Sequence, residues 1–302
     1  MSNVSIEETG EALRFDGGMI SKNQNNPKAN ADFTAIVLAG CRPGCDPVAQ
    51  AFGEKYKALV PMVGQPMICH VVSTLDSSDF IKKIIVVFEC ETTLLDTCPE
   101  FEELPGGTDM QIVSCGKSIS ASVIAAIQAS GENWPYLVTT ADHPLLTKEM
   151  VDHFCTDAKA SKGVSVGMVT RTELEASYPE SSRTYLAFRD AELSGANLFA
   201  FVSDAAKNAI DFWEHIEQQR KKPWKLFKAF GYKNLFGLLM KRFTVDQAFE
   251  RASEVLGVDT TVVRLPFAEA AIDVDKPLDH DQVAEILQCR ASSIAAYGVP
   301  AE

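Results

Sequence analysis

Short apolar runs rich in valine and isoleucine recur along the first half of this chain, and they constrain its fold most strongly. They lie at residues 33–39, 83–88, 110–115, 136–140 and 164–170. Because these runs do not alternate strictly between polar and apolar residues, they are typical of parallel strands covered on both faces. Amphipathic segments at 65–75, 118–130 and 147–159 separate them and predict helices. The order predicts an α/β fold with a doubly wound, mostly parallel sheet.

The second half of the chain departs from this alternation. Residues 183–202 predict two strands about a turn near Asp190, and residues 203–256 have a helical pattern. Residues 260–265 then predict a strand, and residues 277–287 a final helix. Ligands of such open sheets bind at the carboxyl ends of the strands.

These patterns predict a core with an inserted helical segment. The predicted divisions are a polar N-terminal tail (1–31), a core (32–202), a helical insertion (203–256), a return strand and C-terminal helix that complete the core (257–292), and a C-terminal tail (293–302).

The charge of the chain limits the partners that we expect. Lysine and arginine number 28 and aspartate and glutamate 41, so the net charge is −13. A net negative charge disfavours general affinity for nucleic acid or for anionic membranes. The N-terminal residues contain acids where a signal peptide needs an apolar core, and no uncharged apolar run is long enough to span a bilayer. We therefore expect a cytoplasmic protein that does not bind nucleic acid.

Residues 220–242 invert this charge locally. They contain eight basic residues, no acidic residue, and interleaved aromatic side chains such as Trp224 and Phe227. One interpretation is a helical pair whose aromatic side chains pack on the sheet while its lysines face water. The other is peripheral contact with an anionic membrane, or binding of an amphiphilic phosphorylated acceptor.

The most informative motif begins where the first predicted strand ends. Gly40 and Gly44 follow that strand and allow backbone N–H groups to approach a polyphosphate closely. Arg42 and Lys57 supply the cations that a triphosphate requires. The spacing matches neither the dinucleotide fingerprint G-x-G-x-x-G nor the P-loop.

Two consecutive sequence patterns resemble a known family. Residues 38–47 read L-A-G-x-R-x-G-x-D-P, and residues 57–67 read K-A-L-V-P-x-x-G-x-P-M. Both look like the signature of MobA-like NTP transferases, a group with a Rossmann-like, GT-A-type fold. The loop carries one small residue fewer between Ala39 and Arg42 than the commonest pattern. The resemblance implies nucleotide binding by Leu38, Ala39, Gly40 and Gly44, with Arg42 and Lys57 as catalytic residues at the triphosphate.

Later motifs agree with this resemblance in order. Asp142 directly follows a buried strand and lies in a stretch that resembles the family's metal-binding A-D-x-P-L motif. Asp273 and Asp275 lie in a D-x-D element before a proline; they alternate along an extended segment, so only one of them is expected to reach the metal. The resemblance favours Asp275. Mg²⁺ prefers such carboxylates together with phosphate oxygens, and the expected metal ligands are Asp142 and Asp275.

The resemblance also implies contacts with the nucleotide base and the acceptor. Ser122, in a G-x-x-x-x-x-S-V stretch, is a candidate contact with the base. Gly195 and Asn197 lie where related enzymes bind the second substrate, and Asn197 is able to hydrogen-bond a phosphate or a sugar hydroxyl. A tight hairpin that tolerates small residues explains Gly195 and Asn197 equally well.

Together these features predict a Mg²⁺-dependent nucleotidyltransferase. The expected reaction transfers a nucleoside monophosphate from an NTP to a phosphorylated or other anionic acceptor, and pyrophosphate leaves. One alternative is a GT-A-type glycosyltransferase that uses a nucleotide sugar, although Lys57 then has no evident task. Another is a non-catalytic protein that binds nucleotides or associates with a membrane.

Overall fold

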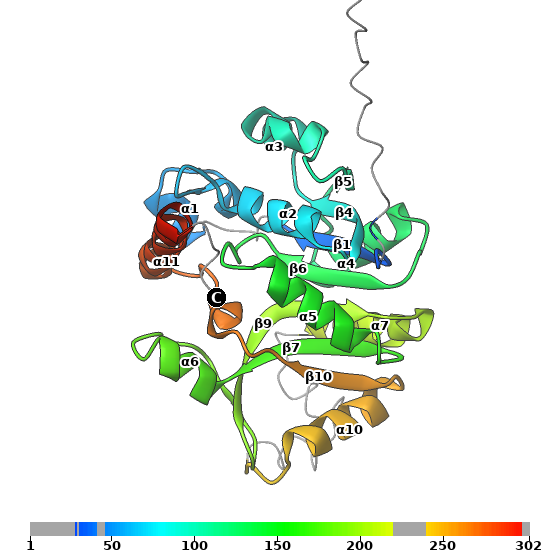
Figure 1. The fold of residues 1–302 in the computed structure, drawn as a ribbon. Coiled ribbons are helices and arrows are strands. Elements are labelled where there is room, and N and C mark those ends of the chain that lie inside the picture. The colour runs from blue at the N-terminus through cyan, green and yellow to red at the C-terminus, as the bar shows by residue number, and fades with distance from the viewer. Residues whose placement is uncertain (1–27, 29, 41–45, 220–239, 298–302) are drawn as a thin grey trace, which may run out of the picture.

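The computed structural model of the chain describes residue 28 and residues 30–40, 46–219 and 240–297 (Figure 1). Arg42, Gly44 and residues 220–239 of the basic aromatic segment therefore lie outside the described residues. Within the described residues, no helix combines the length and the apolar composition needed to cross a membrane.

The described residues form a central sheet of eight strands. These are β1 (Phe33–Leu38), β4 (Ile81–Val87), β5 (Asp109–Val113), β6 (Tyr136–Thr140), β7 (Val164–Thr170), β8 (Leu186–Ala187), β9 (Glu192–Phe201) and β10 (Thr260–Arg264). The strand order is β10-β7-β9-β6-β1-β4-β5, and β8 pairs with β9. Only β9 and β8 interrupt the parallel pairing, because β9 runs antiparallel to β6, β7 and β8. The predicted fold class, a mostly parallel α/β sheet, is confirmed.

Helices and short turns connect these strands. The helices are α1 (Pro47–Ala51), α2 (Met67–Ser77), α3 (Glu91–Thr97), α4 (Ile119–Ala129), α5 (Lys148–Ala158), α6 (Arg171–Ser177), α7 (Lys207–Gln219), α10 (Val245–Leu256) and α11 (Pro277–Tyr297). The 3₁₀ turns are η1 (Lys57–Leu59), η2 (Pro99–Glu102), η3 (Asp204–Ala206) and η4 (Ala268–Ala271). A small hairpin is formed by β2 (Pro61–Met62) and β3 (Gln65–Pro66).

The sheet is covered on both faces, which explains the composition of its strands. Ile36 and Val37 are consecutive in β1 and both fully buried, yet they pack in different apolar clusters. The cluster around Val37 includes α2 and α5, and the cluster around Ile36 includes α4 and α7. Figure 1 shows α2 and α5 in front of the sheet. A strand buried on both faces has no need for alternating polar residues.

Several predicted helices begin where the sequence indicates. Ser118 caps α4 by accepting the N–H of Ala121 at 3.1 Å, and Thr147 caps α5 by accepting the N–H of Met150 at 3.3 Å. The final helix runs ten residues past its predicted end and into the predicted tail. Residues 288–297 contain neither proline nor glycine, so nothing local stops it. The division into a core and an inserted segment stays a prediction.

Candidate active site

The predicted site lies where β1 and β6 end. The N–H of Ala141 donates to the carbonyl oxygen of Leu38 at 3.0 Å, and the N–H of Ala39 donates to that of Val87 at 3.0 Å. These bonds continue the pairing one residue beyond β1 and β6. Gly40 and Asp142 therefore leave the sheet from neighbouring strands at the carboxyl edge, where ligands of open α/β sheets bind.

Three charged residues from distant parts of the chain meet at this edge. The Lys57 ammonium lies 2.5 Å from Asp142 Oδ2 and 3.1 Å from Asp275 Oδ1. The N–H of Val274 donates to the carbonyl oxygen of Asp142 at 2.9 Å, which ties the D-x-D segment to the end of β6. We call Lys57, Asp142 and Asp275 the open cluster. The structure thus brings together the two acids predicted as metal ligands and the predicted catalytic lysine.

Mutual charge stabilises the open cluster. Burial of the Lys57 ammonium opposes its charged form, but Asp142 and Asp275 outweigh burial and raise the pKa of Lys57. Burial likewise opposes the charged form of Asp142, yet Lys57 outweighs it and lowers the pKa of Asp142. Both groups are therefore charged at neutral pH.

The open cluster has free capacity to bind a cation. Asp142 Oδ1 is buried and has no hydrogen-bond partner within the described part of the chain. The Asp275 side chain is 60% exposed. Two carboxylates that already share one cationic group, with an oxygen to spare, are chemically suited to a hard divalent cation.

Asp273 belongs to a second group of contacts. We call Asp273, Arg183 and Asn197 the closed cluster. Arg183 Nη1 donates to Asp273 Oδ1 at 2.7 Å, and Asn197 Nδ2 donates to Asp273 Oδ2 at 2.8 Å. Asp273 and Asp275 thus point to different partners, as the extended spacing predicts. Burial and the charges of Asp275 and Asp142 raise the pKa of Asp273 against the effect of Asn197 and Arg183.

Two neighbours of these clusters have structural contacts. Asp279 Oδ2 accepts the N–H groups of Asp275 at 3.0 Å and Lys276 at 2.8 Å, just before α11 begins. His143 is buried beside Asp142, and its Nε2 lies 3.4 Å from the carbonyl oxygen of Glu269. Burial lowers the pKa of His143 to about 4, so the ring is neutral at pH 7. A neutral imidazole packed inside the protein has a structural role.

The predicted nucleotide-binding residues lie around the end of β1. Ala39 is buried, Leu38 is half-buried and Gly40 is exposed. A Cβ atom on Gly40 would lie 2.6 Å from Cys115 Sγ, so a larger residue there would require the Cys115 side chain to shift. Ser122 is buried, and its hydroxyl accepts the N–H of Gly116 at 2.9 Å in the turn before α4. This bond accounts for Ser122 structurally, and its contact with a base stays a prediction.

The predicted acceptor residues lie on β9. Gly195 is exposed, and a Cβ atom there would meet no protein atom within 4 Å. Packing therefore does not require this glycine. Asn197 has a φ of 51° and donates its amide to Asp273. Its nitrogen is used within the closed cluster, and acceptor binding by either residue stays a prediction.

Two side chains near the site were missed from the sequence as site components. Arg183 lies in the segment 183–202, which predicts two strands. Its ion-pair partners, Asp273 and Asp279, lie 90 and 96 positions away. Glu217 of α7 accepts the N–H groups of Ile119 at 3.1 Å and Ser120 at 3.0 Å at the start of α4. No local pattern signals such long-range pairs.

The comparison with protein-family models matches the MobA-like NTP transferase domain over residues 35–209. The chain belongs to this family. The matched range contains Gly40, Lys57 and Asp142, whereas Asp275 lies beyond it. Membership supports nucleotidyl transfer in general. None of the curated proteins compared with the chain matches it.

Solved structures agree with this membership. A hypothetical transferase from Thermus thermophilus is 26% identical, with a TM-score of 0.65 over 82% of this chain and 99% of its own. A 4-diphosphocytidyl-2C-methyl-D-erythritol synthase from Anaerococcus prevotii is 12% identical, with a TM-score of 0.54 over 86% and 99% of the two chains. A CMP:2-keto-3-deoxy-manno-octonic acid synthetase complexed with CTP is 15% identical, with a TM-score of 0.53 over 85% and 99%. The latter two show that this MobA-like chain shares their fold.

Proposed function

We propose that this MobA-like protein transfers a nucleoside monophosphate from an NTP to a phosphorylated acceptor, with Mg²⁺ as its metal. The observation that carries the proposal is the meeting of Lys57, Asp142 and Asp275 at the carboxyl edge of the sheet. In this reaction an acceptor phosphate oxygen attacks the α-phosphorus of the NTP, and pyrophosphate leaves. Such a step depends on positioning and charge neutralisation rather than on covalent chemistry of the protein.

Asp142 and Asp275 are the residues that would hold the metal ion. Asp142 Oδ1 is buried without a partner among the described residues, and a metal ligand role would satisfy it. When bound, Mg²⁺ would neutralise charge on the phosphate oxygens.

Lys57 has the second role in this proposal. Without ligand, its ammonium neutralises the two carboxylates. With an NTP in the site, we propose that it turns to the phosphate oxygens and stabilises charge that moves onto the leaving pyrophosphate. The backbone of exposed Gly40, just past the end of β1, would border the nucleotide. Arg42, outside the described residues, is proposed as a further phosphate contact.

The test is pyrophosphate release from each of ATP, CTP, GTP and UTP with Mg²⁺ and a panel of phosphorylated acceptors. We expect one NTP and one acceptor to give pyrophosphate and a nucleotidylated acceptor in equal amounts. Asp142→Asn should lower turnover by about 10² or more, the scale of lost electrostatic stabilisation. Asp109→Asn is the matched control, because Asp109 begins β5 at the opposite edge of the sheet and its side chain is 70% exposed.

Two results would contradict the proposal. One is the absence of pyrophosphate with every NTP and acceptor. The other is transfer from a nucleotide sugar in place of an NTP, which would support the glycosyltransferase alternative. The cytoplasmic location and the membrane contact of residues 220–242 stay predictions.

A further inference from the structure

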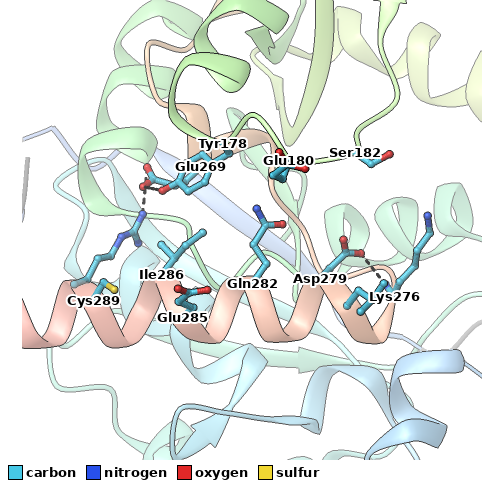
Figure 2. A pocket seen from close by; sticks show the side chains of 12 residues that line it. Tyr178, Glu180, Ser182, Glu269, Lys276, Asp279, Gln282, Glu285, Ile286 and Cys289 are labelled. Atoms are coloured by element: carbon cyan, nitrogen blue, oxygen red, sulfur yellow. Dashed lines mark hydrogen bonds and ion pairs between the residues drawn. The ribbon is translucent and has the colours of Figure 1, made fainter.

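A groove runs along one face of α11 and begins beside the candidate active site. Its volume is about 740 Å³. One wall is the segment 178–182 that follows α6, together with Glu269 of η4, and the other wall is α11. Figure 2 shows side chains from these two walls facing each other across the groove. Gln282, Glu285 and Cys289 line it at helical spacing, so a continuous strip of α11 is available to a ligand.

Asp279 joins this groove to the site. It lines the groove, and its Oδ2 accepts the N–H groups of Asp275 and Lys276 at 3.0 and 2.8 Å. Its Oδ1 accepts Arg183 Nη2 at 3.2 Å. Lys276, which also lines the groove, directly follows Asp275. One end of the groove is therefore one residue from a proposed metal ligand.

The charged groups of the groove are arranged unevenly. Glu269 is compensated, because it accepts Tyr178 OH at 2.6 Å and pairs with Arg290 at 3.4 Å. Glu180 and Glu285 also line the groove, and neither has an ion-pair partner in the part of the chain that the structure describes. The groove thus has a lysine at the end next to the site and two uncompensated carboxylates farther along. Its charge pattern complements a ligand with an anionic end and a cationic body.

We propose that the groove binds the acceptor, and that this acceptor is a phosphorylated amine. The inference rests on the proposed function, because it assigns the acceptor of that same reaction. The acceptor phosphate lies at the Lys276 end, within reach of the reacting NTP, and the ammonium group lies between Glu180 and Glu285. Acceptors with a second anionic group in the body are disfavoured, because Glu180 and Glu285 would repel it.

The test compares two acceptors of similar size, phosphoethanolamine and glycerol 3-phosphate, which differ in the ammonium group. We expect the wild-type protein to have the lower KM for phosphoethanolamine. Both glutamates are exposed, so Glu180→Gln and Glu285→Gln should each raise that KM by about two- to fivefold, the loss expected for one exposed ion pair. The KM for glycerol 3-phosphate, which has no ammonium group, should not rise. Glu254→Gln, an exposed site on α10, is the matched control.

Calorimetric titration of the full chain with phosphoethanolamine in Mg²⁺ separates this inference from the proposed function. Binding that Glu285→Gln weakens, in a protein that releases no pyrophosphate from any NTP, would support the groove and contradict nucleotidyl transfer. Turnover that is equal with both acceptors and unchanged in both glutamine variants would overturn the groove assignment and leave the transfer reaction standing. Absence of phosphoethanolamine binding would also overturn the assignment.

Discussion

The open and closed clusters contain aspartates two residues apart, yet their surroundings differ in kind. Asp275 is 60% exposed and contacts Lys57. Asp273 is 22% exposed and is held by Arg183, itself only 8% exposed, and by Asn197. The closed cluster uses its hydrogen bonds within the protein, whereas the open cluster leaves carboxylate oxygens for a ligand. The comparison shows that two acids of one motif can have different partners and different exposure.

Loss of the open-cluster lysine should have the largest effect. We expect Lys57→Ala to lower turnover by about 10² or more, because the charge on the leaving pyrophosphate loses its stabilising cation. The circular dichroism spectrum should change little, whereas the midpoint of thermal unfolding should fall, because Asp142 loses the cation that compensates its burial. Lys207→Ala is the control, since Lys207 pairs with Glu132 on the surface. Near-wild-type turnover in Lys57→Ala would contradict a catalytic role for the open cluster.

The next largest effect should be the pH dependence of the free energy of unfolding, caused by buried His143. Burial lowers the pKa of His143 to about 4 from its usual 6.5. The unfolded chain therefore takes up the proton first, and the stability contributed by neutral His143 is full above pH 6.5 and lost as the pH falls toward 4. The loss should reach up to about 3 kcal/mol. Denaturant titrations from pH 7.5 to 4.5 in EDTA measure it.

A variant without the His143 ring tests whether His143 causes the loss of stability at acid pH. His143→Gln should flatten the fall in unfolding free energy between pH 6.5 and 4. His153→Gln, which removes a half-buried ring from α5, should retain the slope. An identical slope in both variants would assign the acid sensitivity to other groups.

Removal of the closed-cluster arginine should lower stability by a smaller amount. Arg183→Met leaves Asp273 and Asp279 without their shared cation, and we expect the free energy of unfolding to fall by about 1–3 kcal/mol at pH 7. Urea denaturation measures this change. In the control Arg171→Met the change should stay within about 0.5 kcal/mol, because that arginine is 49% exposed. Equal losses of unfolding free energy in the two variants would mean that the closed cluster stabilises the fold no more than a surface ion pair does.

The smallest expected effect is that of Asp275→Asn on stability. Its pair with Lys57 is exposed on the aspartate side, so the free energy of unfolding should change by no more than about 0.5 kcal/mol. The same urea titration measures it. A loss comparable with that of Arg183→Met would show that Asp275 is part of the folded framework, and the distinction between the two clusters would fail.

Local patterns predicted much of this molecule. The strands at 136–140 and 164–170 were predicted with their observed bounds, since their apolar composition reflects burial on both faces. Ser118 and Thr147 marked helix starts because capping is a contact between residues three apart. By contrast, α3 and α6 are seven residues each and too short for a clear helical period, and they were not predicted.

The sequence by itself determined the α/β architecture, the family and the residue types at the site, because periodicity, caps and the motifs around Gly40 and Asp142 are all local. Only the tertiary structure decided which acid meets which cation. Lys57 and Asp275 are 218 positions apart, and Arg183 and Asp273 are 90 apart. Such pairs form because the whole sheet brings its strand ends together, and no short sequence pattern indicates which distant residues will meet. The physical reason is that burial and charge compensation depend on neighbours in space, and these neighbours are far apart in the sequence.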